Sequence, residues 1–146
     1  MVNQQLALND YVTLFENMNR GNLIHLDRFF TSNAHFKDPF NEVHGLDKIR
    51  LIFEHMFNTL DNPIFHVDEA VLSNDIAYIK WKFNAQLKSK HILLVGLSRV
   101  VFNDQGLVSE HIDYWDASEQ FYMKLPLIGA LMRFIQRQAS AIKATS

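Results

Sequence analysis

The chain has 146 residues, of which 48% are hydrophobic and 21% charged, and its formal net charge is −2. This length and balance predict one globular domain and exclude a largely disordered chain, and the interspersed charges leave no basic face for nucleic acid. The absence of cysteine excludes a disulfide framework, a thiolate zinc site and a cysteine nucleophile.

The N-terminal segment MVNQQLALND lacks the basic and apolar regions of a secretory signal. No apolar run approaches the roughly 20 residues that span a bilayer. We therefore expect a soluble, cytoplasmic protein.

Helical spacing of apolar residues dominates the first half of the chain. Gly and Asn-Pro end helices, and Asn caps them. We predict three helices: residues 8–18 ended by Gly21, residues 23–30 capped by Asn22, and the stretch from Gly45 to Asn62-Pro63.

Alternation with a period of two marks the strands. In residues 34–40 it places Asp38 on the same side as Ala34, Phe36 and Phe40. The short turn sequences SND, KSK and NDQG suit hairpins. We predict four further strands near 64–72, 76–87, 91–102 and 107–116.

Helices followed by a strand meander predict an α+β fold. We expect a cone-shaped, curved antiparallel sheet wrapped around the three N-terminal helices over residues 1–117, with a ligand site at its open mouth. Residues 118–146 are expected to form a C-terminal helical extension, which starts at Pro126 in KLPLIGALMRFIQRQ. This amphipathic helix docks on its own domain, closes the mouth or joins a dimer contact, and the alternative is a membrane-surface helix.

This order of elements, with a strand ending in DPF, resembles the nuclear transport factor 2-like superfamily. The segment GNLIHLDRFFTSNAHFKDPF is similar to the part of ketosteroid isomerase that carries its general base, and the resemblance covers roughly residues 5 to 116. The ketosteroid isomerase and SnoaL-like cyclase branch fits best. This resemblance implies that Asp38 is the base, with Leu14 at the position of the oxyanion tyrosine and Ser98 at that of the oxyanion acid. Phe30 and Phe53 then stand where tyrosines often support that network.

The same alignment sets the phase of LVSEHIDYWD. It turns His111, Asp113 and Trp115 toward the cavity, with His111 and Asp113 close enough to share a hydrogen bond. Together with Asp38 they form a set suited to acid–base chemistry. Burial beside Phe36 and a nearby Asp113 should raise the pKa of Asp38, whereas a protonated His111 would lower it.

We therefore predict a small enzyme that acts by proton transfer on an apolar carbonyl or polyketide-like substrate in a hydrophobic pocket. Asp38 is the expected base, His111 the proton donor or oxyanion partner, and Asp113 its orienter. The resemblance implies no cofactor, and we expect a small apolar ligand and a homodimer. The predicted substrate-binding residues are Leu14, Phe30, Phe36, Phe40, Phe53, Trp81, Ser98 and Trp115.

Other interpretations of the same residues stay open. Asp-Pro before a glycine is also ordinary turn chemistry. The His111–Asp113 pair would equally fill a cavity without a function, and both tryptophans would serve as core. A metal on Asp38, His111 and Asp113 lacks the usual two-histidine set. Epoxide hydrolysis would need an arginine, yet the strand phase turns Arg99 outward. The non-enzymatic alternative is a dimeric ligand-binding or interaction module.

Overall fold

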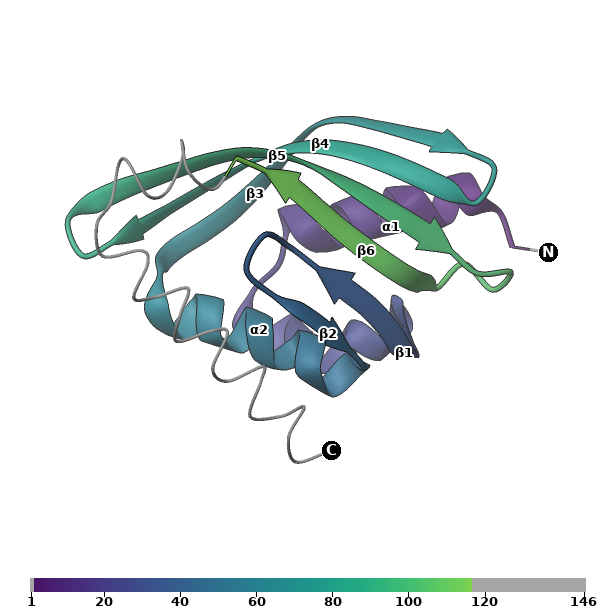
Figure 1. Cartoon of the computed structure of the whole chain (residues 1–146), viewed down its shortest axis with the longest axis horizontal. Helices are drawn as coiled ribbons and strands as arrows, with labels where there is room; N and C mark the ends of the chain where they lie inside the picture. Colours follow the sequence, from purple (N-terminus) through teal and green to yellow (C-terminus); the bar gives the residue numbers. More distant parts are fainter. Residues whose placement is uncertain (1, 117–146) are drawn as a thin grey trace.

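The structure of the chain is a computed structural model, which describes residues 2–116. Apart from one additional short strand, the helices and strands follow one another in the predicted order (Figure 1). The elements are α1 (Gln4–Glu16), η1 (Arg20–Arg28), β1 (Phe30–Lys37), β2 (Glu42–His44), α2 (Leu46–Thr59), β3 (Asp61–Ser73), β4 (Ile76–Leu87), β5 (Lys90–Phe102) and β6 (Val108–Trp115). The predicted C-terminal helix lies outside the described residues.

The six strands form one curved, unclosed sheet in the order β2-β1-β6-β5-β4-β3 (Figure 1). The expectation of a purely antiparallel sheet is wrong at one place, because β1 runs parallel to β6 with Phe36 opposite His111. The other strand pairs are antiparallel. The parallel pairing brings the early strand and the last described strand together as the second and third strands of the order.

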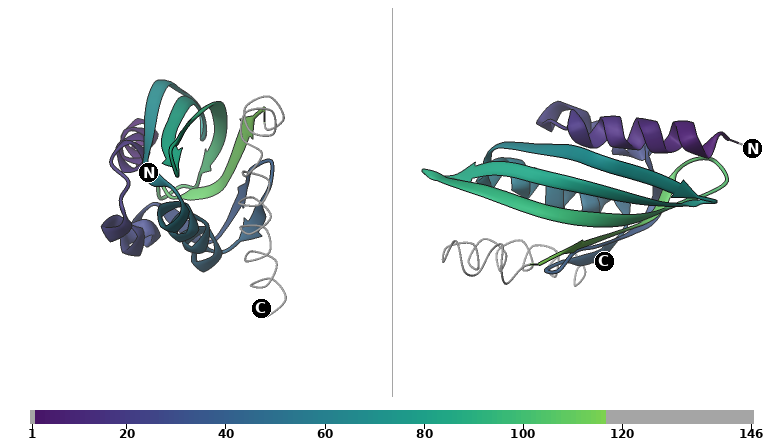
Figure 2. Two further views of the ribbon diagram at one scale, coloured as in Figure 1. Left: turned by 90° about the vertical axis from the view of Figure 1, so that its left-hand side faces the viewer. Right: turned by 90° about the horizontal axis from the view of Figure 1, so that it is seen from above.

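Strand β4 shows how the sequence builds the core. Its side chains alternate, and one face is buried at Ala77, Ile79, Trp81, Phe83 and Ala85. Helix α1 lies along one side of the sheet (Figure 2), and α2 runs below β1 and β2 in the view of Figure 1. The core therefore fills the space between the concave side of the sheet and the helices.

The second predicted helix exists, but it is a 3-10 helix rather than an α-helix. Its residue at the N-terminal cap is Asn19, and Asn22 completes a capping box from inside the helix instead of capping it. Leu23 and Leu26 are its buried residues. Since a 3-10 helix repeats every three residues, it places these two leucines on one face.

The predicted strand over 34–40 begins and ends earlier than expected. β1 stops at Lys37, so Asp38 and Phe40 belong to the turn that leads into the short strand β2. The sequence analysis missed β2, whose three residues are too few for a periodic signal. Gly45, with φ of 104°, then turns the chain into α2.

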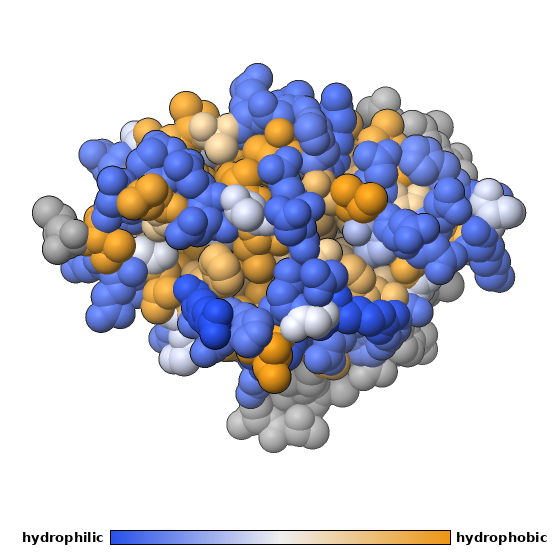
Figure 3. Space-filling model, turned by 180° about the vertical axis from the view of Figure 1, so that it is seen from behind, coloured by the Kyte–Doolittle hydropathy of each residue, from blue (hydrophilic) through white to orange (hydrophobic). Residues whose placement is uncertain are grey.

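On the side of the molecule that α1 covers, apolar residues are interspersed with hydrophilic ones (Figure 3). Leu6 of α1 and Ile24 of η1 are among the exposed apolar residues of the described chain. Among the helices of residues 2–116, none has the length and apolar character needed to cross a bilayer.

Candidate functional site

A small cavity lies between α1 and the concave face of the sheet. Its volume is about 40 Å³, which is room for about three water molecules. Most of its lining is aromatic or aliphatic, and its polar groups come from Tyr11, Ser98, His111 and Asp113. We call this space the inner cavity, and it is lined by Tyr11, Val12, Phe15, Phe53, Phe65, Val67, Ile79, Trp81, Ser98, His111 and Asp113.

The polar groups of the inner cavity form one hydrogen-bonded chain. The hydroxyl of Tyr11 lies 2.7 Å from Nδ1 of His111, whose Nε2 lies 2.7 Å from Oδ1 of Asp113. The same Oδ1 accepts the hydroxyl proton of Ser98, and Ser98 Oγ accepts Nε1–H of Trp81 at 2.8 Å. The hydrogen bond expected between His111 and Asp113 is therefore present.

The direction of each hydrogen bond in this series follows from its last donor, the indole N–H of Trp81. An indole N–H donates and never accepts, so Ser98 must use a lone pair toward Trp81 and its single proton toward Asp113. Asp113 then accepts from Ser98 through Oδ1. The proton of Ser98 is thus committed to Asp113, so the Ser98 hydroxyl offers no donor to a ligand.

Aromatic rings surround the His111 imidazole. Phe36 of β1 stacks on it with a centroid distance of 5.0 Å, and Phe15 of α1 lies 5.6 Å away. Tyr11 lies at the other end of the hydrogen bond to His111. Its pKa is raised well above the ordinary value of 10.0, mainly by burial and secondly by the charge of Asp113. Tyr11 thus keeps its proton at any pH near neutral.

Asp38 occupies a different position from the one predicted, at the head of the turn after β1. Its Oδ1 accepts the backbone N–H groups of Phe40 at 2.8 Å and Asn41 at 2.7 Å. Nδ2 of Asn41 donates to both carboxylate oxygens at 3.2 Å. These bonds are those of a side chain that stabilises its own turn.

The pKa of Asp38 is nevertheless raised from 3.8 to about 6. Burial is the largest cause, and the nearby charge of Asp113 adds to it, while the hydrogen bonds from Phe40 and Asn41 oppose the shift. The two raising causes that the sequence analysis named, burial and the charge of Asp113, are thus both present.

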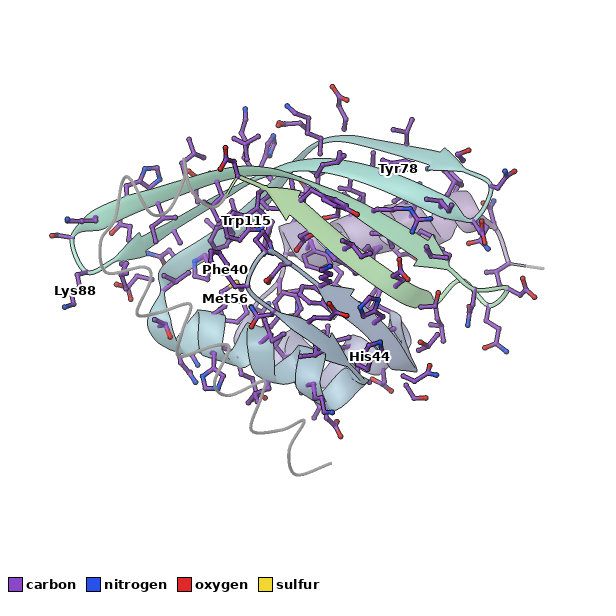
Figure 4. All side chains as sticks on the ribbon, in the orientation of Figure 1. Phe40, His44, Met56, Tyr78, Lys88 and Trp115 are labelled. Carbon is purple, nitrogen blue, oxygen red and sulfur yellow. The ribbon has the colours of Figure 1, made fainter. Side chains whose placement is uncertain are left out.

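Asp38 and Asp113 meet at a second, wider space. This outer pocket has a volume of about 510 Å³ and is lined by Lys37, Asp38, Pro39, Ile112, Asp113, Tyr114 and Trp115. At its margin Phe40 and Trp115 lie next to each other, with ring centroids 5.2 Å apart (Figure 4). Asp113 borders both spaces, so it stands between the inner cavity and Asp38.

The predicted substrate-binding residues divide into four groups. Phe53, Trp81 and Ser98 line the inner cavity, and Trp115 lines the outer pocket with Phe40 beside it. Phe36 lies against His111. The remaining two, Leu14 and Phe30, line neither space.

Leu14 and Phe30 therefore need a correction. Leu14 is three residues after Tyr11, which rotates it by about 60° around the helix, and it borders a depression between α1 and η1. Phe30 is buried and packs against the ring of Tyr11, with centroids 5.6 Å apart. Both residues support the site from outside rather than facing a ligand.

The sequence analysis missed Tyr11, Phe15 and Phe65 as lining residues. It included Tyr11 and Phe15 only as part of the helix predicted over residues 8–18. The available signal was the hydroxyl of Tyr11, because a tyrosine on a buried helical stripe must find a hydrogen-bond partner. That partner is His111, which lies 100 positions further along the chain.

Two alternatives of the sequence analysis find little support in residues 2–116. This part of the chain holds no group of three His, Cys, Asp or Glu side chains arranged for a metal ion. Arg99 faces away from both spaces and forms an ion pair with Glu110 at 3.1 Å. An arginine bridge between Asp38 and Asp113 is thus missing from the described residues.

Comparison with known families decides the relationship. The family model for the SnoaL-like domain matches residues 11–111, from Tyr11 to His111. The chain belongs to the SnoaL-like domain family. The match spans the hydrogen-bonded chain except for Asp113, which follows its end by two residues.

Solved structures share the fold at low sequence identity. A protein from Catenulispora acidiphila with a ketosteroid isomerase-like fold is 12% identical with a TM-score of 0.67, over 80% of this chain and 89% of that one. A putative SnoaL-like polyketide cyclase from Jannaschia sp. CCS1 is 11% identical with a TM-score of 0.69, over 79% and 88%. An epoxide hydrolase resembling limonene epoxide hydrolase, from M. tuberculosis, is 12% identical with a TM-score of 0.68, over 88% and 93%.

A search of curated proteins found no match. Because the structural relatives are so distant in sequence, they establish the nuclear transport factor 2-like fold alone.

Proposed function

We propose that this SnoaL-like protein is a small-molecule enzyme that transfers a proton next to a carbonyl group, as an isomerase or cyclase. The observation that carries the proposal is the position of Asp113. It ends the hydrogen-bonded chain from Tyr11 and His111, and it shares the outer pocket with Asp38. Two acid–base systems thus meet at one carboxylate.

Asp38 is the proposed base. With a pKa of about 6 it is mostly ionised at neutral pH, yet it binds a proton more strongly than an exposed aspartate. It removes a proton from the carbon beside the carbonyl, and the electron pair moves onto the carbonyl oxygen as an enolate. Where a carbon–carbon double bond is conjugated with the enolate, Asp38 then returns the proton to the far carbon of that bond and the double bond shifts, so the reaction consumes no cofactor.

The proposed substrate is either small, or only part of it enters the inner cavity. The inner cavity, with room for about three water molecules, suits a carbonyl group and its immediate carbon neighbours. A larger apolar remainder would lie in the outer pocket against Trp115. This arrangement places the reacting carbons near Asp113, between the two carboxylates.

Hydrogen exchange tests the proposal without knowledge of the product. A panel of small cyclic ketones is incubated with the protein in D₂O, and NMR follows deuterium incorporation beside the carbonyl. Asp38→Asn should reduce the enzyme-dependent rate by about 10²–10⁴-fold, the usual contribution of a general base. Asp104→Asn, at an exposed turn residue, is the matched control. Equal exchange by wild type and Asp38→Asn would remove Asp38 as the base.

The second candidate is a ligand-binding or interaction module without chemistry. It is favoured by the bonds that hold the Asp38 carboxylate in its own turn. In that case the exchange experiment gives only the buffer rate with every ketone, while ligands still bind.

We also propose a homodimer that forms through the outer face of the sheet. Large apolar side chains are exposed on this face at Tyr78, Leu93, Leu97 and Tyr114. They come from the three neighbouring strands β4, β5 and β6. Exposed apolar patches of this kind often mark interfaces.

A cytoplasmic location stays a prediction from the sequence.

A further inference from the structure

We propose that protonation of His111 changes the kind of small molecule that the inner cavity accepts, from a hydrogen-bond donor such as an amine to a carbonyl compound, with Tyr11 O–H as the group that binds the carbonyl oxygen. The inference rests on the proposed function, since it names how that site would receive its carbonyl. It follows from counting the protons along the chain of hydrogen bonds.

The first step is the state with neutral His111. Trp81 N–H is given to Ser98, and the Ser98 proton is given to Asp113. His111 then gives Nε2–H to Asp113 and accepts the Tyr11 proton at Nδ1. Every polar proton on this wall is in use, and only lone pairs remain for a ligand.

Those lone pairs belong to Tyr11, Ser98 and Asp113. The Oδ1 atom of Asp113 takes both of the hydrogen bonds that the described residues give to this carboxylate, so Oδ2 keeps its accepting capacity. A carbonyl oxygen meets no donor on this wall. An ammonium group does find acceptors, beside a carboxylate and among the aromatic rings of Phe15, Phe65 and Trp81.

The second step adds one proton to His111. Nδ1 now carries a hydrogen and must donate it to the Tyr11 oxygen, because the two atoms are 2.7 Å apart. Tyr11 does not lose its own proton, so its O–H turns away from His111. Tyr11 lines the inner cavity, and the released O–H is therefore a donor for a ligand oxygen there.

Among the described residues, few charged groups surround His111, so few charges affect its protonation. Asp113 faces it from its own strand, and Tyr11 faces it from α1. β5 contributes the uncharged Ser98 through Asp113, β1 contributes the ring of Phe36, and α2 contributes Phe53 to the same cavity. Asp38, beyond Asp113, is the next acid.

Two probes of equal size separate the two states. Acetone and isopropylammonium each have four heavy atoms, which suits the inner cavity, but the first only accepts hydrogen bonds and the second only donates. The ¹⁵N and ¹H signals of the His111 ring are followed by NMR from pH 4.5 to 8.5, with each probe up to about 0.5 M because so small a ligand binds weakly.

Linkage sets the signs of the expected shifts. A ligand that prefers the protonated site raises the titration midpoint of His111, and one that prefers the neutral site lowers it. Acetone should therefore move the midpoint to higher pH and isopropylammonium to lower pH. A tenfold preference corresponds to a shift of about one pH unit. The ¹⁵N shift should also show that the added proton sits on Nδ1.

Tyr11→Phe removes the donor and retains the ring. It should abolish the acetone shift and keep the isopropylammonium shift, while Asp104→Asn, at an exposed turn residue, should behave as wild type. The inference is overturned if acetone acts equally on Tyr11→Phe, if neither probe moves the midpoint, or if Nδ1 stays unprotonated at low pH. These readouts need no turnover, so acetone shifts without deuterium exchange would refute only the proposed function.

Discussion

The six-membered ring of Trp81 occupies the space in which a side chain at Gly96 would begin. The two residues are direct partners across the β4–β5 ladder. A β-carbon on Gly96 would collide with three atoms of the indole. The missing side chain thus lets Trp81 lie close to β5, where its N–H reaches Ser98 two residues further along.

Gly96→Ala should displace the indole and break its hydrogen bond to Ser98. We expect the free energy of unfolding to fall by about 1–3 kcal/mol, the usual cost of forcing extra atoms into a packed core. Urea denaturation followed by tryptophan fluorescence measures this. Ile24→Ala, at an exposed residue of η1 outside the proposed dimer face, is the control and should cost much less. An unchanged stability in Gly96→Ala would contradict the close contact.

Ser98→Ala should leave the N–H of Trp81 buried without an acceptor. The expected cost is about 1–3 kcal/mol, because an unpaired buried donor loses its full solvation. Trp81→Phe removes that donor, so Ser98→Ala should cost less in the Trp81→Phe background than in wild type. A double-mutant cycle of urea denaturation measures the coupling. Additive costs would show that the Trp81–Ser98 bond contributes nothing measurable.

Asp38 should make the protein less stable as the pH rises. Its pKa of about 6 in the folded chain lies above 3.8, so the stability it contributes is complete below pH 3.8 and is lost as the pH passes through 6. The loss is up to about 3 kcal/mol. Asp38→Asn should remove this dependence. The free energy of unfolding of the variant minus that of wild type should therefore be larger at pH 7 than at pH 4. Parallel curves would contradict the raised pKa.

Tyr11 should resist ionisation until the protein unfolds. The sequence has four tyrosines, and burial together with Asp113 raises the pKa of this one well above 10.0. In absorbance titrations at 295 nm, wild type and Tyr11→Phe should gain the same signal between pH 9 and 11 while both remain folded. A larger gain in wild type within this range would show that Tyr11 ionises in the folded chain.

Leu97→Glu should weaken the proposed dimer by placing a charge on the outer face of β5. Sedimentation velocity over a hundredfold range of concentration should show a dimer for wild type and a monomer for the variant. Leu6→Glu, at an exposed residue of α1, is the matched control and should stay dimeric. A monomeric wild type at every concentration would remove the proposal.

Much of the fold was predictable because it depends on local patterns. The alternation in β4 identified the buried face that includes Trp81, and helical spacing identified α1 and α2. The parallel pairing of β1 with β6 was not predictable in the same way. It joins segments that are distant in the sequence, and no local spacing records which strand becomes a neighbour.

The candidate site was predictable only where two residues lie on one strand. His111 and Asp113 share a face of β6, so their hydrogen bond follows from a spacing of two. The Tyr11–His111 contact depends instead on where α1 crosses the sheet. Asp38 was singled out by the family resemblance and not by spacing. Its carboxylate has a raised pKa, as a catalytic base would, and it also accepts the hydrogen bonds of its own turn.

The long separation between Tyr11 and His111 also has a kinetic meaning. The hydrogen bond closes a loop of 100 positions and joins the first helix to the last described strand. Contacts between such distant segments carry a large loop-closure entropy and form slowly. The imidazole signal of His111 therefore reports the completion of folding rather than its beginning. In a stopped-flow refolding experiment it would mark the moment at which the chemistry of the site becomes available.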